Sequence, residues 1–301
     1  MENPVSLYLL TLGSKVSRTS TLNKLNMVAQ NHGFKDAYEY PWEGVNYVTV
    51  LNVMADMESS KKSHSTINAT LSAIKGVTKQ CWMTNRLDGD TFSRIKNIKQ
   101  KKSERLSTGQ AVSHPDVEAL FNTIGDSLKD VRDAAILTLG FGMGLRREEI
   151  AQLKLHQVKI KEQTVRVIGK GNKEREVPMD KRSFKLLNKW IDCIKKEKSL
   201  QKIEGEHLFG RINKAQRIEN LKGIDNSTIW RVLKSVAKRS GVDFDTLPAP
   251  HDMRRTRITK WLDLSDVRTA QKLAGHNHVQ TTMGYDRGDL TDKMRAVQDQ
   301  D

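Results

Sequence analysis

The strongest constraint on the fold is one β-hairpin in a chain whose other apolar residues follow a helical period. Residues 163–179 read QTVRVIGKGNKEREVPM, with β-branched residues on both sides of a Gly-Lys-Gly-Asn turn. Glycine supplies the unusual backbone dihedrals that a tight turn needs. The sequence therefore predicts a mainly α protein with a small antiparallel β-sheet, in the α+β class.

Helices are expected on both sides of this hairpin. In residues 63–81, the side chains Ile67, Leu71, Ile74 and Cys81 recur at spacings that line one face of a helix. The other segments for which we expect helices are 5–12, 17–28, 45–57, 130–139, 145–155, 184–194 and 226–239.

The length of the chain and one polar segment predict two domains. At roughly 100–200 residues per domain, 301 residues suffice for two cores. The segment IKNIKQKKSERLSTG is polar and basic, which is typical of an interdomain linker, although a solvated helix end has the same composition. Ser113, followed by Pro115, has the features of a helix start. We expect a helical domain over 1–100, a basic linker over 101–111 and a second domain over 112–301.

The charge balance points to a polyanionic partner. The chain has 51 Lys and Arg against 36 Asp and Glu, a formal net charge of +15, which favours DNA or RNA as a partner over a neutral one. A Lys-rich solvated surface would give the same count. The two cysteines, Cys81 and Cys193, lie far apart, which excludes a disulfide scaffold and fits a reducing compartment. No stretch approaches the ~18 consecutive apolar residues of a membrane span, so we expect a cytoplasmic, nucleoid-associated protein.

Three motifs that would bind a cofactor or a metal fail on their context. GFGMGLR resembles a dinucleotide-binding loop but follows a predicted helix rather than a strand. GKGNK lacks the upstream glycine spacing and the hydroxyl residue of a P-loop, and a strand follows it. His276 and His278 form an HxH pair without a cysteine or carboxylate cluster at metal-ligand spacing. We therefore expect no cofactor and no metal ion.

A scattered set of basic, imidazole and phenol groups remains. Each member has a plainer explanation by itself, as a surface cation, a helix cap or a core aromatic. Together they suit phosphoryl transfer, because guanidinium groups match the charge on the non-bridging oxygens, and a tyrosine oxygen can attack phosphorus. A lysine on a turn can protonate the leaving 5′ oxygen, and imidazoles can accept or donate a proton. The set consists of Arg146, Lys170, His251, Arg254, His276 and Tyr285.

The order and context of these residues resemble the tyrosine recombinase family, also called the phage integrase family, from about residue 105 to 287. GLRREEIAQL is similar to the family's first arginine box, VIGKGNKEREVPM to its β-hairpin and HDMRRTRITKWL to its His-x-x-Arg box. LAGHNHVQTTMGY matches the final box, with His276 nine residues before Tyr285. The chain departs from the pattern at Arg255, where the family often has histidine, at LAGH in place of LGH, and near 262–265, where the usual glycine is absent.

The resemblance implies a role for each group. Tyr285 would attack the phosphate and give a 3′-phosphotyrosyl link with a free 5′ hydroxyl. Lys170, rather than Lys173, would be the general acid. His251 would assist proton transfer. The transition-state charge would be stabilised by Arg146, Arg254 and His276, with Glu149 orienting its neighbours from a second layer.

The resemblance also implies an architecture and an assembly. Residues 1–100 would be a SAM-like core-binding domain, and 112–301 a catalytic domain with a C-terminal tail, the two clamping DNA from opposite faces. A homotetramer would exchange strands of paired core sites through a Holliday junction. The tail would dock on a neighbouring subunit or form a frayed end. The candidates for DNA contacts outside the catalytic set are Lys75, Lys79, Lys99, Lys101, Lys102 and Arg105.

Within the family we favour the integrase of a mobile genetic element, with a plasmid- or chromosome-dimer resolvase as the alternative. In a chain of this length we expect no additional N-terminal arm-binding domain. Partner proteins that bend DNA or set the direction of the reaction are compatible with either role. A type IB topoisomerase shares the chemistry, and a non-cleaving DNA-binding regulator is the alternative from a different class.

Overall fold

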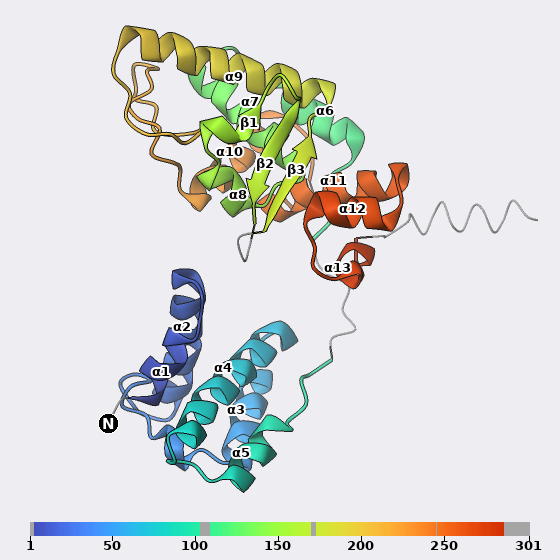
Figure 1. Ribbon diagram of the computed structural model, residues 1–301. Coiled ribbons are helices and arrows are strands. Elements are labelled where there is room, and N and C mark those ends of the chain that lie inside the picture. The colour runs from blue at the N-terminus through green and yellow to red at the C-terminus, as the bar shows by residue number, and fades with distance from the viewer. Residues whose placement is uncertain (1–2, 103–108, 170–172, 245, 286–301) are drawn as a thin grey trace, which may run out of the picture. The chain divides into compact units, whose positions relative to one another are not determined.

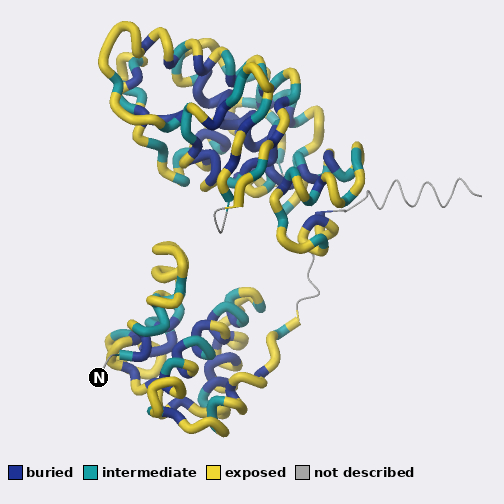
Figure 2. The backbone as a smooth tube through the Cα atoms, in the orientation of Figure 1, coloured by how far each residue is buried: buried dark blue, intermediate teal, exposed yellow. Residues whose placement is uncertain are grey.

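The computed structural model describes residues 3–102, 109–169, 173–244 and 246–285. The chain divides into two compact units, Met1–Leu106 and Ser107–Asp301 (Figure 1). Within each unit, the buried residues form one hydrophobic core beneath an exposed surface (Figure 2).

The N-terminal unit is helical in its described residues. Side chains of Ser14, Asn46, Ser63 and Asp88 each accept a backbone N–H of the helix that follows, which satisfies a donor that a helix start leaves free. The apolar face predicted in 63–81 is confirmed, since its residues are at most 1% exposed. The elements are α1 (Pro4–Leu10), α2 (Lys15–Asn31), the 3₁₀ helix η1 (Trp42–Gly44), α3 (Tyr47–Ser59), α4 (His64–Met83) and α5 (Gly89–Lys96).

The two ends of the segment predicted as a linker pack on different units. The side chain of Asn68 on α4 exchanges two hydrogen bonds with the main chain of Lys101, both 2.8 Å. Directly after the other end, the backbone N–H of Val112 donates to Thr256 Oγ1 at 2.8 Å. Residues 103–108, which include Arg105, lie outside the described residues.

The C-terminal unit is a helical assembly around one small sheet. Its helix α7 is buried from Val131 to Phe141 and packs against α9 and α11. The elements are α6 (His114–Asn122), α7 (Leu128–Phe141), α8 (Arg147–Gln152), the 3₁₀ helix η2 (Leu155–Gln157), β1 (Val158–Lys159), β2 (Thr164–Ile168), β3 (Glu174–Pro178), α9 (Lys181–Leu200), α10 (Asn226–Arg239), α11 (Pro250–Leu264), α12 (Val267–Ala274) and α13 (Val279–Met283).

The predicted hairpin is confirmed. Strands β2 and β3 pair antiparallel from Thr164↔Pro178 to Ile168↔Glu174, and Gly169 N–H donates to the Lys173 carbonyl at 2.7 Å to close the pairing. The short strand β1 adds to the free edge of β2, which the sequence pattern did not predict. Together with the helices, this sheet confirms the predicted fold class.

One predicted helix is shorter than expected. The segment 145–155 was expected to be helical throughout, but α8 begins at Arg147 and ends at Gln152. Arg146 has extended backbone dihedrals, and its N–H donates to Glu149 Oε2 at 2.8 Å, so it caps the helix rather than joining it. Leu153 is extended as well and ends the helix.

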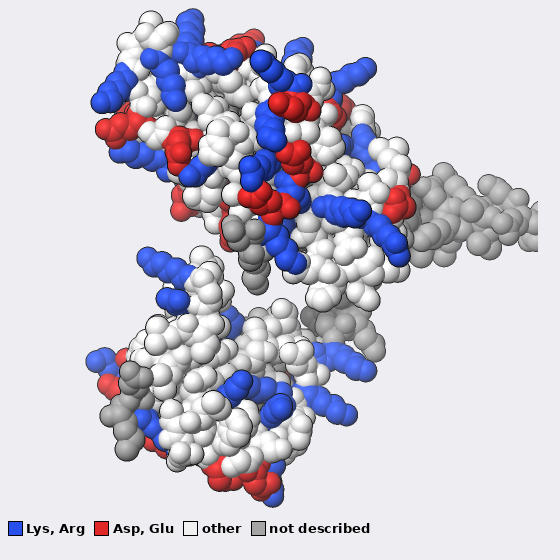
Figure 3. Space-filling view, in the orientation of Figure 1, with Lys and Arg blue, Asp and Glu red and all other residues white. Residues whose placement is uncertain are grey.

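Figure 3 shows the charged side chains on one face of each unit. On the C-terminal unit basic side chains are mixed with acidic ones, whereas on the N-terminal unit the acidic ones lie toward the edges of the view. Within the described ranges, no helix is both long and apolar enough to cross a membrane.

Candidate active site

Tyr285 stands at the centre of a cluster of the predicted site residues. It follows α13 and is 8% exposed. Its ring stacks on the His276 ring, with centroids 5.6 Å apart and an interplanar angle of 14°, and the Arg255 guanidinium lies 5.0 Å from the ring centroid. Its hydroxyl lies 3.0 Å from His251 Nε2 on α11. The phenol oxygen therefore has a proton acceptor within hydrogen-bond distance.

Arg254 is a buried member of this cluster. It is 1% exposed, one residue before Arg255 on α11. Its Nη1 donates to the Gly144 carbonyl at 2.5 Å, and its Nη2 donates to the Ala274 carbonyl at 2.5 Å. Nη2 also lies 3.0 Å from His276 Nε2. Since guanidinium nitrogens only donate, this His276 nitrogen accepts, and the proton of the neutral ring sits on Nδ1, 2.9 Å from Thr282 Oγ1.

Arg146 enters the site from the start of α8. Its Nη1 donates to Glu149 Oε1 at 2.9 Å and its Nη2 to the Gly275 carbonyl at 3.2 Å. The side chain is 37% exposed, so part of the guanidinium faces solvent. The structure thus brings together two hydrogen-bonded pairs, Arg146 with Glu149 and Arg254 with His276, which are anchored on the neighbouring carbonyls of Gly275 and Ala274 and adjoin Tyr285.

Arg175 on β3 joins this group and was not among the sequence candidates. Its Nη1 and Nη2 donate to Glu149 Oε1 and Oε2 at 2.9 and 2.8 Å, and its Nε donates to the Leu273 carbonyl at 3.0 Å. The alternation of the strand was the available signal, because it places Arg175 on the same face as buried Val177. Arg255, which the sequence marked only as a departure, is the second addition.

Burial and the surrounding cations hold both imidazoles neutral. Desolvation, followed by the charges of Arg254 and Arg146, lowers the pKa of His276 to about 4. Desolvation and the neighbouring Arg255 also lower the pKa of His251. Burial lowers the pKa of Arg254 to about 10, which leaves it cationic at neutral pH. The site therefore combines fixed guanidinium charge with neutral imidazoles that can accept a proton.

Lowering the pH from about 7 to about 5 is expected to destabilise the protein through His276. Its pKa is about 4 in the folded protein against 6.5 as the reference value. The unfolded chain therefore binds more protons between these two values, and the free energy of unfolding falls as the pH drops through this window. Thermal unfolding across it should show a shallower pH slope for His276→Gln than for the wild type. The control is His278→Gln, which removes an exposed imidazole and should keep the wild-type slope; equal slopes for all three proteins would contradict the prediction.

Lys170, the predicted general acid, lies outside the described residues. The described residues next to it lie close to the cluster. A Cβ on Gly169 would lie 3.5 Å from Arg175 Nη1 and from Glu149 Oε1. Directly before β3, Lys173 Nζ donates to Asn277 Oδ1 at 2.9 Å, beside His276. The hairpin therefore leads toward the same site.

The predicted DNA-contact lysines of the N-terminal unit differ in their surroundings. Lys75 is half-buried, and its Nζ donates to the carbonyls of Lys96 and Ile98 at 2.8 and 2.6 Å, so it ties α4 to the end of α5. Lys101 pairs with Glu58 at 2.9 Å. The other three, Lys79, Lys99 and Lys102, are exposed.

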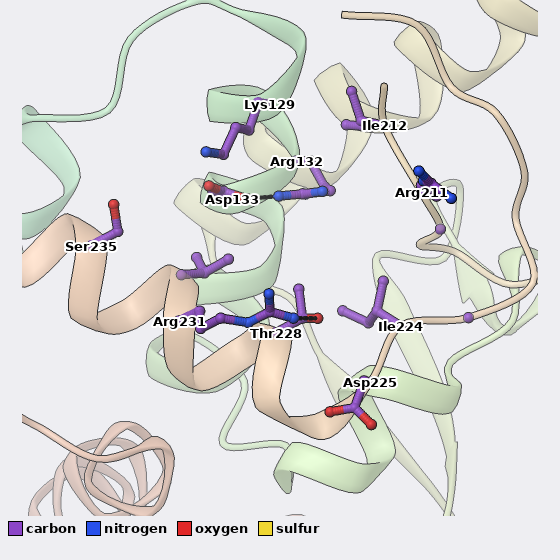
Figure 4. A pocket seen from close by; sticks show the side chains of 13 residues that line it. Lys129, Arg132, Asp133, Arg211, Ile212, Ile224, Asp225, Thr228, Arg231 and Ser235 are labelled. Atoms are coloured by element: carbon purple, nitrogen blue, oxygen red, sulfur yellow. Dashed lines mark hydrogen bonds and ion pairs between the residues drawn. The ribbon is translucent and has the colours of Figure 1, made fainter. Parts of the chain in front are cut away.

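A pocket of about 500 Å³ lies in the C-terminal unit between α7, α10 and the segment 210–225 (Figure 4). Arg132 pairs with Asp133 at 2.7 Å on one side, and Arg231 Nη2 donates to Thr228 Oγ1 at 2.9 Å on the other. None of the predicted catalytic residues lines it. Among the described residues, no group of three or more His, Cys, Asp or Glu side chains could hold a metal ion.

The chain is similar to known proteins over most of its length. A family model described as "Phage integrase family" matches residues 110–290. Tyrosine recombinase XerC of Corynebacterium glutamicum is 30% identical over 225 residues, which cover 74% of this chain and 68% of that protein. Tyrosine recombinase XerC of Staphylococcus epidermidis is 27% identical over 283 residues, covering 93% and 90%.

Solved structures share the fold. A lambda integrase dimer bound to a COC′ core site matches with a TM-score of 0.68 and 14% identity, covering 96% of each chain. The Tn1549 transposon integrase in complex with circular intermediate DNA matches with a TM-score of 0.65 and 17% identity, covering 99% of each chain.

Fold and site together define a site-specific recombinase of the tyrosine type. Because the family model matches more than half of the residues, the chain belongs to the phage integrase family. The family predicted from the motifs is confirmed.

Proposed function

We propose that this protein cleaves and rejoins DNA at specific sites through a covalent bond between Tyr285 and a 3′ phosphate. The observation that carries the proposal is the Tyr285 hydroxyl, 3.0 Å from His251 Nε2 and beside the Arg146, Arg254 and His276 group. The tyrosine oxygen forms a bond to phosphorus while the bond from phosphorus to the 5′ oxygen breaks. The phosphodiester energy is retained in the phosphotyrosine, and the reverse attack by a 5′ hydroxyl reseals a strand.

The protons follow from the protonation states in the site. His251, whose pKa is lowered, is neutral at pH 7 and accepts the phenol proton. Lys170 donates a proton to the leaving 5′ oxygen. Arg146, Arg254 and His276 stabilise the negative charge that develops on the non-bridging oxygens, while Glu149 orients Arg146.

DNA with paired core sites is the partner in this proposal, held by a clamp of the 1–100 and 112–301 domains. The net charge of +15 supports a polyanionic partner, with exposed lysines adding salt-dependent contacts to the backbone. Two structural neighbours support this partner, a lambda integrase dimer bound to a COC′ core site and the Tn1549 integrase in complex with circular intermediate DNA. We extend this to a homotetramer that exchanges strands through a Holliday junction.

The role in the cell is proposed at two levels. The general role is that of a site-specific recombinase. The specific role is that of the integrase of a mobile element, which the lambda and Tn1549 integrase neighbours support. The XerC relatives support the alternative, a resolvase of plasmid or chromosome dimers, because they share the greater sequence identity. The location of the target site separates the two roles, since an integrase site lies at the end of a mobile element.

Covalent trapping tests the proposal. Wild type and Tyr285→Phe are expressed in cells, the lysate is denatured, and protein-linked DNA is recovered and sequenced. Adducts are expected only with the wild type and at one sequence, because the phenylalanine ring has no nucleophile. The matched control is Tyr38→Phe, which removes a phenol oxygen in the N-terminal unit and should leave adducts unchanged. Adducts scattered over all sequences would favour a topoisomerase, and sequence-specific binding without adducts would favour a non-cleaving regulator.

A further inference from the structure

Two arginines, Arg146 and Arg175, donate hydrogen bonds to the buried carboxylate of Glu149 beside the candidate active site. Glu149 Oε1 accepts from Arg146 Nη1 and from Arg175 Nη1, each at 2.9 Å. Glu149 Oε2 accepts from the Arg146 backbone N–H and from Arg175 Nη2, each at 2.8 Å. Every polar contact of Arg146 with Glu149 thus has a counterpart from Arg175 on the same oxygen.

The two arginines differ in what else they can reach. The Arg175 side chain is 10% exposed, and each of its three nitrogens donates to a protein oxygen, two to Glu149 and one to the Leu273 carbonyl. The Arg146 side chain is 37% exposed. Arg146 can therefore meet a phosphate from solution, whereas Arg175 is turned toward the protein.

The net charge of this group depends on Arg175. The Glu149 side chain is 5% exposed, and although its burial alone would raise its pKa, Arg175 and Arg146 together lower it to about 2, so it is ionised at neutral pH. Arg146 and Glu149 by themselves sum to zero charge, which would leave little net attraction for a phosphate. With Arg175 the group of three carries one positive charge, and its exposed member is Arg146.

We propose that Arg175 is a positioning residue that compensates the charge of Glu149, so that Arg146 keeps its full positive charge for the scissile phosphate. The inference rests on the proposed function and names a residue that works through Glu149 without touching the DNA. It accounts for an arginine that is only 10% exposed on a strand whose neighbouring residues, Glu174 and Glu176, are exposed. The carboxylate would then orient Arg146 without cancelling it.

The test compares Arg175→Gln and Arg175→Lys with wild type in single-turnover cleavage of the site found by trapping. Gln keeps a hydrogen-bond donor but loses the charge, so cleavage of ordinary DNA should slow about ten- to a hundredfold. Lys keeps the charge but not the two-point fork, so its loss should be smaller. Arg166→Gln on neighbouring β2 is the matched control: it removes a hairpin charge paired with Glu174 rather than Glu149 and should cleave like wild type.

A second substrate tests whether Arg175 acts through its charge or only by maintaining the structure of the site. DNA with a methylphosphonate at the scissile position has no negative charge there, so it does not need the charge that Arg175 preserves. Wild type and Arg175→Gln should cleave this DNA at rates within about threefold of each other. Thermal unfolding and DNA binding are measured for each variant. If Arg175→Gln does not fold, Arg175→Lys carries the comparison, and a Lys variant as active as wild type on both substrates supports the proposal.

The outcomes distinguish a failure of this inference from a failure of the proposed function on which it rests. A deficit of Arg175→Gln that persists undiminished on the methylphosphonate would overturn the charge role, and so would an Arg175→Lys deficit larger than that of Arg175→Gln. Wild-type protein that forms no adduct on either DNA would overturn the proposed function, and this inference with it.

Discussion

Replacing Arg254 with alanine should slow DNA cleavage more than a thousandfold and lower the free energy of unfolding by about 3 kcal/mol. The large effect on stability follows from where the guanidinium lies. It is 1% exposed and donates to the carbonyls of Gly144 and Ala274, which belong to the turn before α8 and to the end of α12. Truncation leaves both buried carbonyls without this donor and opens a cavity between the two segments.

The effect on cleavage has a separate cause. Arg254 fixes the acceptor role of His276 Nε2, 3.0 Å away, and supplies positive charge beside the His276 ring that stacks on Tyr285. Arg254→Lys separates the two effects, because lysine keeps the charge but cannot reach three acceptors in a planar fork. Chemical denaturation of Arg254→Lys should show a smaller loss of stability, while its cleavage stays at least a hundredfold below wild type. Cleavage by Arg254→Ala within about tenfold of wild type would refute the assignment.

The sequence predicted residue types better than it predicted their partners. The motif boxes named Arg146, Arg254, His276 and Tyr285, and the structure brings these residues together. The motif boxes could not show that Arg254 donates hydrogen bonds to the Gly144 and Ala274 carbonyls, because these lie 110 and 20 residues away along the chain. Such pairings arise from the packing of α11 against its neighbours, which a local pattern does not encode.

The local nature of sequence patterns also explains the errors in the predicted helices and strands. The hairpin was predictable because its turn chemistry and alternation are local, and β1 was missed because a two-residue strand has too few positions for a period. Helix α8 was predicted too long, since apolar spacing continues past both ends while the backbone does not. Its start depends on the bond from the Arg146 N–H to Glu149, which a hydrophobic pattern does not register.

Arg175 shows how tertiary context changes the meaning of a residue. In the sequence it is one cation among the alternating charges of KERE. In the structure it is inward-facing and bonded to Glu149, whereas Arg166 on the adjacent strand pairs with Glu174 and is exposed. Strand alternation was a signal for the direction of the side chain that the sequence analysis did not use, and only the packing of the sheet against α8 and α12 supplied its partner.

A substitution at Gly275 should disturb this group from the opposite side. Gly275 ends α12 with a left-handed backbone, φ +64°, and its carbonyl accepts from Arg146 Nη2. A Cβ there would lie 3.0 Å from Arg175 Cδ and 3.2 Å from its Nη1, so the arginine would have to move. Gly275→Ala should therefore lose about 1 kcal/mol from backbone strain, and its cleavage should slow about ten- to a hundredfold.

The matched control is Gly241→Ala, at the end of α10. Gly241 has nearly the same backbone, φ +69°, but a Cβ there would have no neighbour within 4 Å. The two variants should lose a similar free energy to left-handed strain, measured by urea denaturation, while Gly241→Ala cleaves DNA like wild type. The difference between them isolates the contact with Arg175. If both cleaved equally well, the position of the Arg175 side chain would not govern the site, and the charge it brings to Glu149 would have to act without a defined geometry.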